Sequence, residues 1–252
     1  MLELEWDGER VVPGKTPEAV FRQTEMRYVF AGRFAKGCVV LDVASGSGIG
    51  THHLLRAGAK CCIGLDLSPE STQYASSNYP GCNFAVCNAA DLCLADRSVD
   101  LIVSFETIEH LPDPTAFLLQ CKRVLRPNGL LLCSTPNWST YRYWLPNPFH
   151  ISEMATQEFL RTMQEVYVGC RLYGQCFVEY PLFVARRMTA KLLQNLRLRD
   201  FAKGFVRAPL EGVCTQVEFS LEDRYPLEAV VPYTHKWHKQ PQYVIVVGRN
   251  AS

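Results

Sequence analysis

Hydrophobic residues along this chain fall into two alternating patterns: short, continuously apolar runs, and longer segments whose apolar residues recur at helical spacing. Short apolar runs are typical of strands buried on both faces of a parallel sheet, whereas recurrence every three or four residues indicates helices. The apolar runs predict seven strands, near 38–44, 61–67, 83–88, 101–105, 130–134, 171–177 and 243–247. The helical spacing predicts five helices, near 17–36, 51–57, 69–78, 115–125 and 152–166.

The order of these elements predicts the fold class, because strands that alternate with helices form parallel sheets covered on both faces. We therefore expect an α/β fold with a Rossmann-like, doubly wound and mostly parallel seven-stranded sheet whose last strand is antiparallel. A single domain over 1–252 is expected, with an N-terminal cap at 1–36 and the core of the sheet at 37–136. Residues 137–151 are expected to form a lid, and 181–238 an insertion before the final strand.

The lid and the insertion both depart from the alternating pattern. The lid is rich in aromatic residues set among prolines, which is typical of a pocket wall. These aromatic residues are Trp138, Tyr141, Tyr143, Trp144 and Phe149. The first half of the insertion is basic and has an amphipathic helical spacing, with one acidic residue, Asp200. Its basic residues are Arg186, Arg187, Lys191, Arg197, Arg199, Lys203 and Arg207. This pattern is consistent with a solvated face, a site for an anionic substrate group, or peripheral contact with a membrane.

The overall charge narrows the class of partner. Among 252 residues, 26 basic and 25 acidic side chains give a formal net charge of +1. A protein whose main partner is nucleic acid carries an excess of basic residues, so we expect no nucleic-acid partner. We also expect no transmembrane segment and no secretory signal, because no apolar run approaches the length of a span and the N-terminus is acidic. We therefore expect a cytoplasmic protein.

Eleven cysteines raise the question of a disulfide framework or a metal site. Their number is odd, no two are spaced as Cys-x-x-Cys, and most lie in apolar runs such as 38–41. Cysteine in such a run behaves as a small hydrophobic residue. We therefore expect buried thiols and no metal site.

A glycine-rich turn carries the clearest chemical signal. Gly46, Gly48 and Gly50 stand at alternate positions between a predicted strand and a predicted helix. Glycines allow a tight turn and a close approach to a ligand, and the start of a helix offers free N–H groups. Asp66 follows about twenty residues later at the end of the next strand, where a carboxylate can accept ribose hydroxyls. The dinucleotide fingerprint Gly-x-Gly-x-x-Gly would need its third glycine at position 51, where this chain has Thr51. The spacing of the glycines therefore disfavours NAD as the ligand.

The turn, with Asp42 four residues before Gly46, resembles the first motif of the class I S-adenosylmethionine-dependent methyltransferases. Other segments over residues 8–180 are similar to the methyltransferase type 11 group. They are Gly8–Pro13, Arg27-Tyr28, Ser104–His110, Arg123–Gly129, Ser134–Asn137, Asn147–His150 and Leu172–Gln175. Within that group, they are similar to bacterial enzymes associated with surface-polysaccharide and glycan modification. The resemblance implies S-adenosylmethionine as cofactor and S-adenosylhomocysteine as product.

Carried over position by position, the resemblance implies a cofactor site. Gly46 and Gly48 would pack against the methionine portion, Asp66 would bind the ribose, and Leu67 would flank the adenine. Asp91 matches the acidic residue that receives the adenine amino group, and its alternative is an exposed loop carboxylate. The full expected set is Arg27, Tyr28, Asp42, Ala44, Gly46, Gly48, Asp66, Leu67, Ala90, Asp91, Leu92 and Ser104.

Five residues keep two interpretations each. Arg27 and Tyr28 either reach the carboxylate of the cofactor or pack and pair at the surface. A hydroxyl acceptor needs a base near the mouth of the site, because its proton has to be withdrawn. His110, after the fourth strand, and His150, in the lid, are each a candidate catalytic base or a structural residue. Glu106 is a third candidate, or it shapes the pocket floor and orients a substrate hydroxyl.

The sequence favours a small-molecule or glycan acceptor. Methyltransferases that act on nucleic-acid or amide nitrogen often carry Asn-Pro-Pro-Tyr after the fourth strand, where this chain has Ser104–Thr107. The leading hypothesis is O-methylation of a saccharide or glycan-linked small molecule. A phenolic, quinone-like or other natural-product acceptor is the alternative. A nicotinamide-dependent oxidoreductase and an inactive cofactor-binding module are more distant ones. The acceptor, the methylated atom and the oligomeric state stay open.

Overall fold

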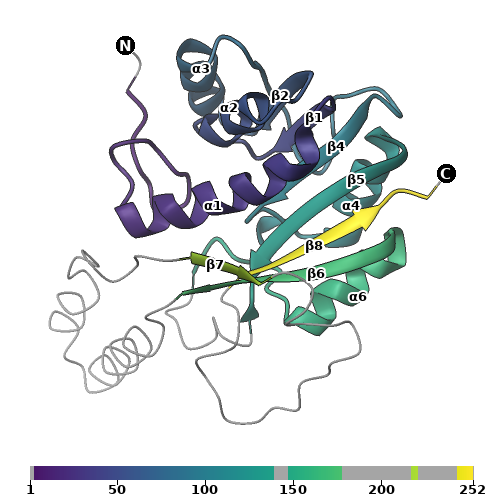
Figure 1. The fold of residues 1–252 in the computed structure, drawn as a ribbon. Coiled ribbons are helices and arrows are strands. Elements are labelled where there is room, and N and C mark those ends of the chain that lie inside the picture. The colour runs from purple at the N-terminus through teal and green to yellow at the C-terminus, as the bar shows by residue number, and fades with distance from the viewer. Residues whose placement is uncertain (1–2, 139–146, 178–216, 221–242, 252) are drawn as a thin grey trace, which may run out of the picture.

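The computed structural model describes residues 3–138, 147–177, 217–220 and 243–251. Within these residues, eight strands form one sheet (Figure 1). The strands are β1 (Val39–Val43), β2 (Cys61–Asp66), β3 (Asn83–Val86), β4 (Val99–Phe105), β5 (Leu125–Pro136), β6 (Val168–Phe177), β7 (Val217–Ser220) and β8 (Tyr243–Arg249). Their spatial order is β3-β2-β1-β4-β5-β8-β6-β7.

Strands β1 to β5 are parallel to their neighbours, whereas β8 is antiparallel to both β5 and β6. This arrangement confirms the predicted α/β fold, with all seven predicted strands and an antiparallel last strand. The short strand β7 is an addition that lies inside the expected insertion at 181–238 and pairs antiparallel with β6. The strand order reverses at β1, which has β2 on one side and β4 on the other. Ligands of open α/β sheets bind at such a point, outside the carboxyl ends of the strands.

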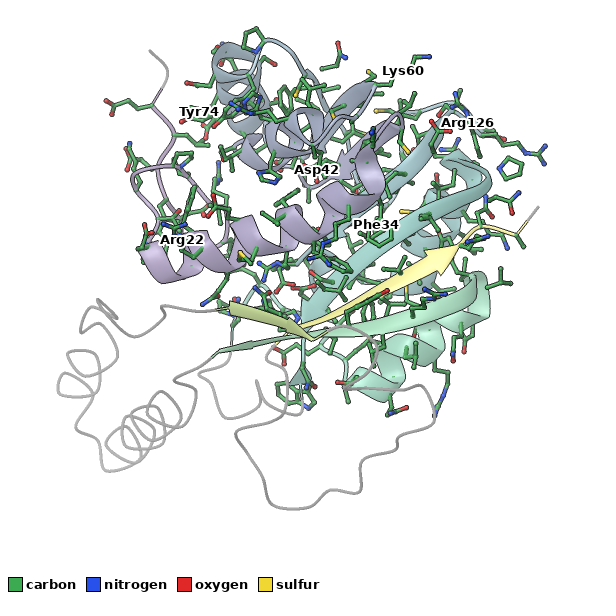
Figure 2. The ribbon with its side chains drawn as sticks, in the orientation of Figure 1. Arg22, Phe34, Asp42, Lys60, Tyr74 and Arg126 are labelled. Atoms are coloured by element: carbon green, nitrogen blue, oxygen red, sulfur yellow. The ribbon has the colours of Figure 1, made fainter. Side chains whose placement is uncertain are left out.

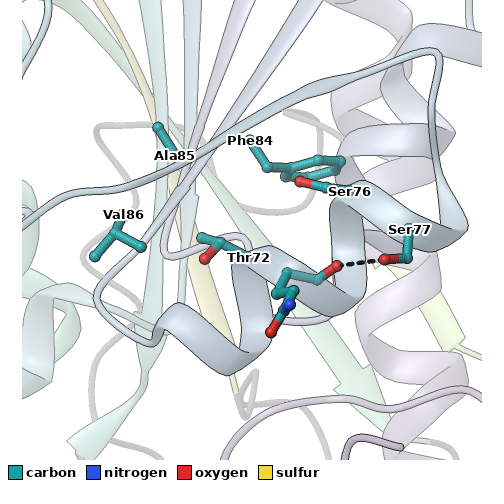
Figure 3. A pocket seen from close by; sticks show the side chains of 7 residues that line it. Thr72, Ser76, Ser77, Phe84, Ala85 and Val86 are labelled. Atoms are coloured by element: carbon teal, nitrogen blue, oxygen red, sulfur yellow. Dashed lines mark hydrogen bonds between the residues drawn. The ribbon is translucent and has the colours of Figure 1, made fainter. Parts of the chain in front are cut away.

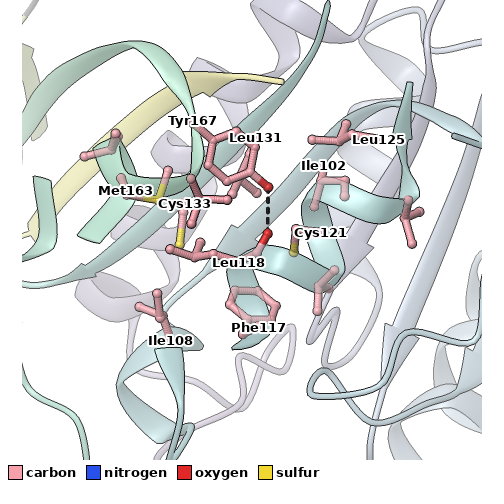
Figure 4. Close-up of a cluster of buried hydrophobic side chains, with 14 of the residues drawn as sticks. Ile102, Ile108, Phe117, Leu118, Cys121, Leu125, Leu131, Cys133, Met163 and Tyr167 are labelled. Atoms are coloured by element: carbon pink, nitrogen blue, oxygen red, sulfur yellow. Dashed lines mark hydrogen bonds between the residues drawn. The ribbon is translucent and has the colours of Figure 1, made fainter. Parts of the chain in front are cut away.

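Helices cover both faces of this sheet (Figure 1). They are α1 (Glu18–Ala35), α2 (Ile49–Arg56), α3 (Pro69–Asn78), α4 (Pro114–Val124) and α6 (Thr156–Val166), with a short 3-10 helix η1 (Ile108–His110). On one face, Phe30 of α1 and Leu54 of α2 share a buried cluster with Val103 of β4. On the other face, Phe117 of α4 packs in a second cluster with Ile102 of β4 (Figure 4). Neighbouring residues of β4 thus pack into hydrophobic clusters on opposite faces of the sheet, as expected of a strand buried on both faces.

Local signals explain where two of the helices begin. At α3, the side chain of Ser68 accepts a hydrogen bond from the backbone N–H of Ser71, and Pro69 occupies the first helical position. At α4, the side chain of Asp113 accepts one from the N–H of Ala116, again with proline in the first turn. Such caps satisfy N–H groups that a helix leaves unpaired, and proline there loses no hydrogen bond.

Two boundaries differ from the prediction by more than three residues. Strand β5 begins at Leu125, before the predicted start at 130, because Leu125 pairs with Val99 ahead of a register shift in the β4–β5 ladder. Helix α6 begins at Thr156, after the predicted start at 152. The chain before it is held instead by the backbone oxygen of Glu109, which accepts hydrogen bonds from the N–H groups of residues 151 and 152.

Several sequence predictions fall outside the described residues. They concern the basic segment of the insertion and three of the lid aromatic residues, Tyr141, Tyr143 and Trp144. Among the cysteines whose side chains the structure describes, nine are free thiols and six of these are buried, which agrees with the predicted packing role. Among the described helices, none has the combination of length and apolarity that a membrane span requires.

Candidate active site

The glycine-rich turn leaves β1 at the point where the strand order reverses, and its glycines serve different purposes. A Cβ atom at Gly48, where φ is +82°, would lie 2.6 Å from Cβ of Ala75, and one at Gly50 would collide with the ring of Tyr28. A Cβ at Gly46, where φ is +53°, would meet only Cβ of Arg10, at 3.8 Å. Gly48 and Gly50 are therefore required by packing within the protein, and Gly46 marks the part of the turn that stays open.

Polar groups at and near this turn have hydrogen-bonding capacity that the protein itself does not use. Oδ2 of Asp66 accepts a hydrogen bond from the N–H of Gly46 (2.8 Å), and Oδ1 accepts one from Ser68 (2.9 Å). Each carboxylate oxygen has a second lone pair, so Asp66 retains the capacity to accept ribose hydroxyls. Within the described residues, the buried hydroxyl oxygens of Ser45, Ser47 and Ser104 have no hydrogen-bond partner. Buried polar groups are usually paired, so these hydroxyls are candidates to contact a ligand.

Asp42 lies on β1 just before the turn and is fully buried. Its carboxylate accepts hydrogen bonds from the hydroxyl groups of Thr51 (2.6 Å) and Tyr28 (3.0 and 3.2 Å), next to β1 and α1 (Figure 2). Burial raises the pKa of Asp42 to about 7, although both hydrogen bonds lower it. In this environment Asp42 fixes the packing of α1 and α2 against the turn.

Arg27 and Tyr28 are both buried, so neither lies at the surface. The hydroxyl of Tyr28 is occupied by Asp42. Nη1 of Arg27 donates to Oε1 of Gln175 (2.8 Å), and its guanidinium lies 4.7 Å from the ring centroid of Tyr243. Nε of Arg27 is buried and has no partner among the described residues. Of the two residues expected to reach the cofactor's carboxylate, Arg27 keeps a donor for an anion.

The residues expected around the adenine lie after β2 and β3. Leu67 is 69% exposed, which leaves an apolar side chain uncovered next to Asp66. Ala90 and Asp91 are exposed, and the N–H of Asp91 donates to the backbone oxygen of Asn88 in a tight turn. Leu92 is buried and anchors this turn in the core. Exposure of Asp91 agrees with both of its interpretations, so its role stays a prediction.

A separate cavity of about 380 Å³ lies between α3 and β3 (Figure 3). It is lined by Thr72, Gln73, Ser76, Ser77, Phe84, Ala85 and Val86. None of the residues that the sequence predicts for the site lines it. The cavity nevertheless reaches the carboxyl end of β3, because Val86, which lines it, pairs with Asp66.

The carboxyl end of β4 carries a pair of acidic residues. Glu106 has a φ of +53°, which is rare for a residue with a side chain, and its Oε1 accepts a hydrogen bond from the hydroxyl of Ser134 (2.6 Å). Glu109 is fully buried and accepts one from Thr135 (3.1 Å). Burial raises the pKa of both carboxyl groups, and the charge of Glu106 raises that of Glu109 further. Sequence reasoning missed Glu109, because nothing in its local pattern distinguishes it from a surface acid.

The two predicted histidines meet beside this acidic pair. The rings of His110 and His150 lie edge to face with centroids 5.0 Å apart. Nδ1 of His110 is 2.9 Å from the backbone oxygen of Phe149, and its Nε2 is 3.6 Å from Oε2 of Glu9. Nδ1 of His150 is 2.9 Å from Oε1 of Glu153. Glu106, His110 and His150 thus gather where β4 and the end of the lid meet.

Comparisons with known proteins agree with this geometry. A family described as "Methyltransferase domain" matches residues 41–133. Over 161 residues, the chain is 37% identical to a protein of Mycolicibacterium smegmatis described as "Probable S-adenosylmethionine-dependent methyltransferase", covering 62% of each chain. It is also 32% identical over 106 residues to a ubiquinone biosynthesis O-methyltransferase of Cereibacter sphaeroides, covering 40% of this chain and 42% of that one. The chain spans less than two thirds of the length of these relatives.

Solved structures share the fold at low sequence identity. A S-adenosylmethionine-dependent methyltransferase of Thermotoga maritima superimposes with a TM-score of 0.58 at 15% identity, over 91% of this chain and 92% of that one. A [4+2]-cyclase, SpnF, superimposes with a TM-score of 0.56 at 16% identity, over 97% and 86% of the two chains. Such similarity establishes the fold alone, because one fold serves several reactions. Residues 41–133 therefore match a methyltransferase domain, and in sequence and fold the chain is similar to S-adenosylmethionine-dependent methyltransferases.

Proposed function

We propose that this protein transfers a methyl group from S-adenosylmethionine to an oxygen atom of a small-molecule acceptor, with a saccharide or glycan-linked molecule as the acceptor class. The observation that carries the proposal is the convergence of two half-sites at one edge of the sheet. The open turn at Gly46 with Asp66 forms the cofactor half, and Glu106, His110 and His150 form the acceptor half. The relatives described as O-methyltransferases support an oxygen acceptor.

When bound, S-adenosylmethionine supplies an electrophilic methyl group on a positively charged sulfur. Asp66 and the Gly46 turn would hold the nucleoside and amino-acid portions, and the buried cation of Arg27 suits the carboxylate. As the new oxygen–carbon bond forms and the sulfur–carbon bond breaks, the acceptor hydroxyl loses its proton. The histidine pair with Glu106 receives that proton, since these groups lie at the same edge of the sheet.

The saccharide class is supported by residues at the rim of this edge. Trp138 is 42% exposed, and Phe149, which precedes His150 in the sequence, is 58% exposed, so both apolar rings face solvent. Aromatic rings stack on sugar rings and on planar phenols alike. A phenolic or quinone-like acceptor is therefore the second candidate, and the ubiquinone O-methyltransferase relatives favour it.

An acceptor screen tests the proposal. The full chain is incubated with S-adenosylmethionine and sugar nucleotides, glycans or phenols, and formation of S-adenosylhomocysteine is measured over time. With the best acceptor, His110→Ala and His150→Ala should leave cofactor affinity nearly unchanged, and at least one should lower turnover by roughly a hundredfold. His53→Ala, on α2, is the matched control and should keep full turnover. Full activity of both His110→Ala and His150→Ala would remove the histidine pair from the mechanism.

A further inference from the structure

Three side chains from separate parts of the chain converge at the acceptor half of the site. Glu9 comes from the loop before α1, His110 from η1 after β4, and His150 from the end of the lid. One carboxylate oxygen and one nitrogen from each ring all lie within 4.8 Å of one another. Two imidazoles and a carboxylate are a donor set that binds divalent first-row transition ions while leaving coordination positions open.

The hydrogen bonds around His110 show which of its nitrogens faces this cluster. A backbone carbonyl can only accept, so Nδ1 of His110 carries the proton that it shares with the oxygen of Phe149. In the neutral ring, Nε2 then presents a lone pair, and it lies 3.6 Å from Oε2 of Glu9. Two electron-rich atoms therefore face each other. Their separation is close to that of two ligand atoms that bind the same metal ion, each about 2.1 Å from it.

The other two side chains are also held by neighbours. Nδ2 of Asn147 donates to Oε1 of Glu9 (3.0 Å), which leaves Oε2 directed at His110. Oε1 of Glu153 lies 2.9 Å from Nδ1 of His150 and orients that ring. Metal-binding histidines and carboxylates characteristically have such outer partners, which fix ring orientation and tautomer.

We propose that Glu9, His110 and His150 bind one divalent transition-metal ion. The ion accepts the oxygen of the substrate hydroxyl as a further ligand and lowers the pKa of that hydroxyl. With the ion bound, the lone pairs of the two histidines are occupied, so the proton passes to the carboxylate of Glu106 before methyl transfer. The role in catalysis rests on the proposed function, whereas binding of the ion does not. The sequence predicted no metal site, and these three residues lie far apart along the chain without any ligand spacing that would mark them.

Co²⁺ titration of the metal-free full chain tests the site without acceptor or cofactor. The visible absorption of Co²⁺ reports nitrogen and oxygen ligands, and a near-ultraviolet thiolate band reports binding to cysteine. We expect one Co²⁺ per chain without a thiolate band. Affinity should fall by roughly tenfold or more in Glu9→Gln and His150→Ala, and Glu153→Gln should weaken it about tenfold through the outer partner.

Glu5→Gln is the matched control, because Glu5 lies in the same loop but pairs with Lys15 and should leave Co²⁺ affinity unchanged. Unchanged affinity in Glu9→Gln and His150→Ala, a thiolate band, or no binding by the wild-type chain would each overturn the metal site. Those outcomes leave methyl transfer standing. Metal binding without formation of S-adenosylhomocysteine from any acceptor would count against the proposed function instead.

Discussion

The buried carboxyl of Asp42 makes the stability of this protein depend on pH in an unusual direction. Its pKa is raised from 3.8 to about 7 in the folded state, chiefly by burial. Between these two values the folded chain keeps a proton that the unfolded chain has lost, so stability falls as pH rises. At about 1.4 kcal/mol for each pH unit, the rise corresponds to about 4 kcal/mol of unfolding free energy, lost progressively from about pH 4 to above pH 7.

Asp42→Asn isolates this effect. An asparagine oxygen in place of Oδ2 can accept from Thr51 and Tyr28, and its NH₂ group can donate to the Tyr28 hydroxyl oxygen, so the hydrogen bonds are kept without a titrating group. Urea unfolding in reducing buffer, followed by circular dichroism, gives the unfolding free energy of both proteins. From about pH 5 to pH 8, the variant should gain about 3 kcal/mol relative to the wild type.

Asp100→Asn is the control, because the pKa of Asp100 is lowered from its ordinary value of 3.8, the opposite direction to that of Asp42. Its burial is outweighed by hydrogen bonds from the N–H of Val39 and from Arg126. The stability that Asp100 contributes is complete above pH 5 and is lost only as pH falls through its folded-state pKa. The gap between this variant and the wild type should therefore stay constant from pH 5 to pH 8. A constant gap for Asp42→Asn as well would refute the buried, protonated state of Asp42.

Two further predictions concern the turn. Gly48→Ala should lower the unfolding free energy by about 2–3 kcal/mol, since its Cβ would lie 2.6 Å from that of Ala75. Gly46→Ala should lower the unfolding free energy by only about 1 kcal/mol, but it should weaken S-adenosylhomocysteine binding measured by calorimetry. Equal effects of both on stability would contradict the division of roles. Tyr28→Phe should cost about 1–2 kcal/mol in the same unfolding assay, because it removes a donor from buried Asp42, and an unchanged value would count against that hydrogen bond.

The fold followed from the sequence wherever a local signal was strong. Helix α3 begins and ends where predicted, because Ser68 caps it and Pro69 opens it. The start of β5 was missed, since Pro127, Asn128 and Gly129 have the composition of a turn. There Asn128 adopts a φ of +64° within a strand that keeps its pairing with β4 on both sides. Local composition cannot reveal such a pairing.

The site was predictable in part, for the same reason. Gly46 and Asp66 belong to a local motif, and the structure joins them by a hydrogen bond. The partners of Arg27 and His110 were not predictable, because Gln175 and Glu9 lie far from them in the sequence and only the fold brings each pair together. When the partner of a polar group comes from a distant segment, no short sequence motif contains both residues.

We propose that the Gly46 turn and Asp66 hold S-adenosylmethionine. Calorimetric titration with S-adenosylhomocysteine tests it most directly, with NAD as competitor and Asp66→Asn as the variant. We expect one S-adenosylhomocysteine per chain, little or no NAD binding, and an affinity lower by roughly ten- to a hundredfold in Asp66→Asn, as the loss of a charged acceptor implies. Tighter binding of NAD than of S-adenosylhomocysteine, or equal affinity in the wild type and Asp66→Asn, would contradict it.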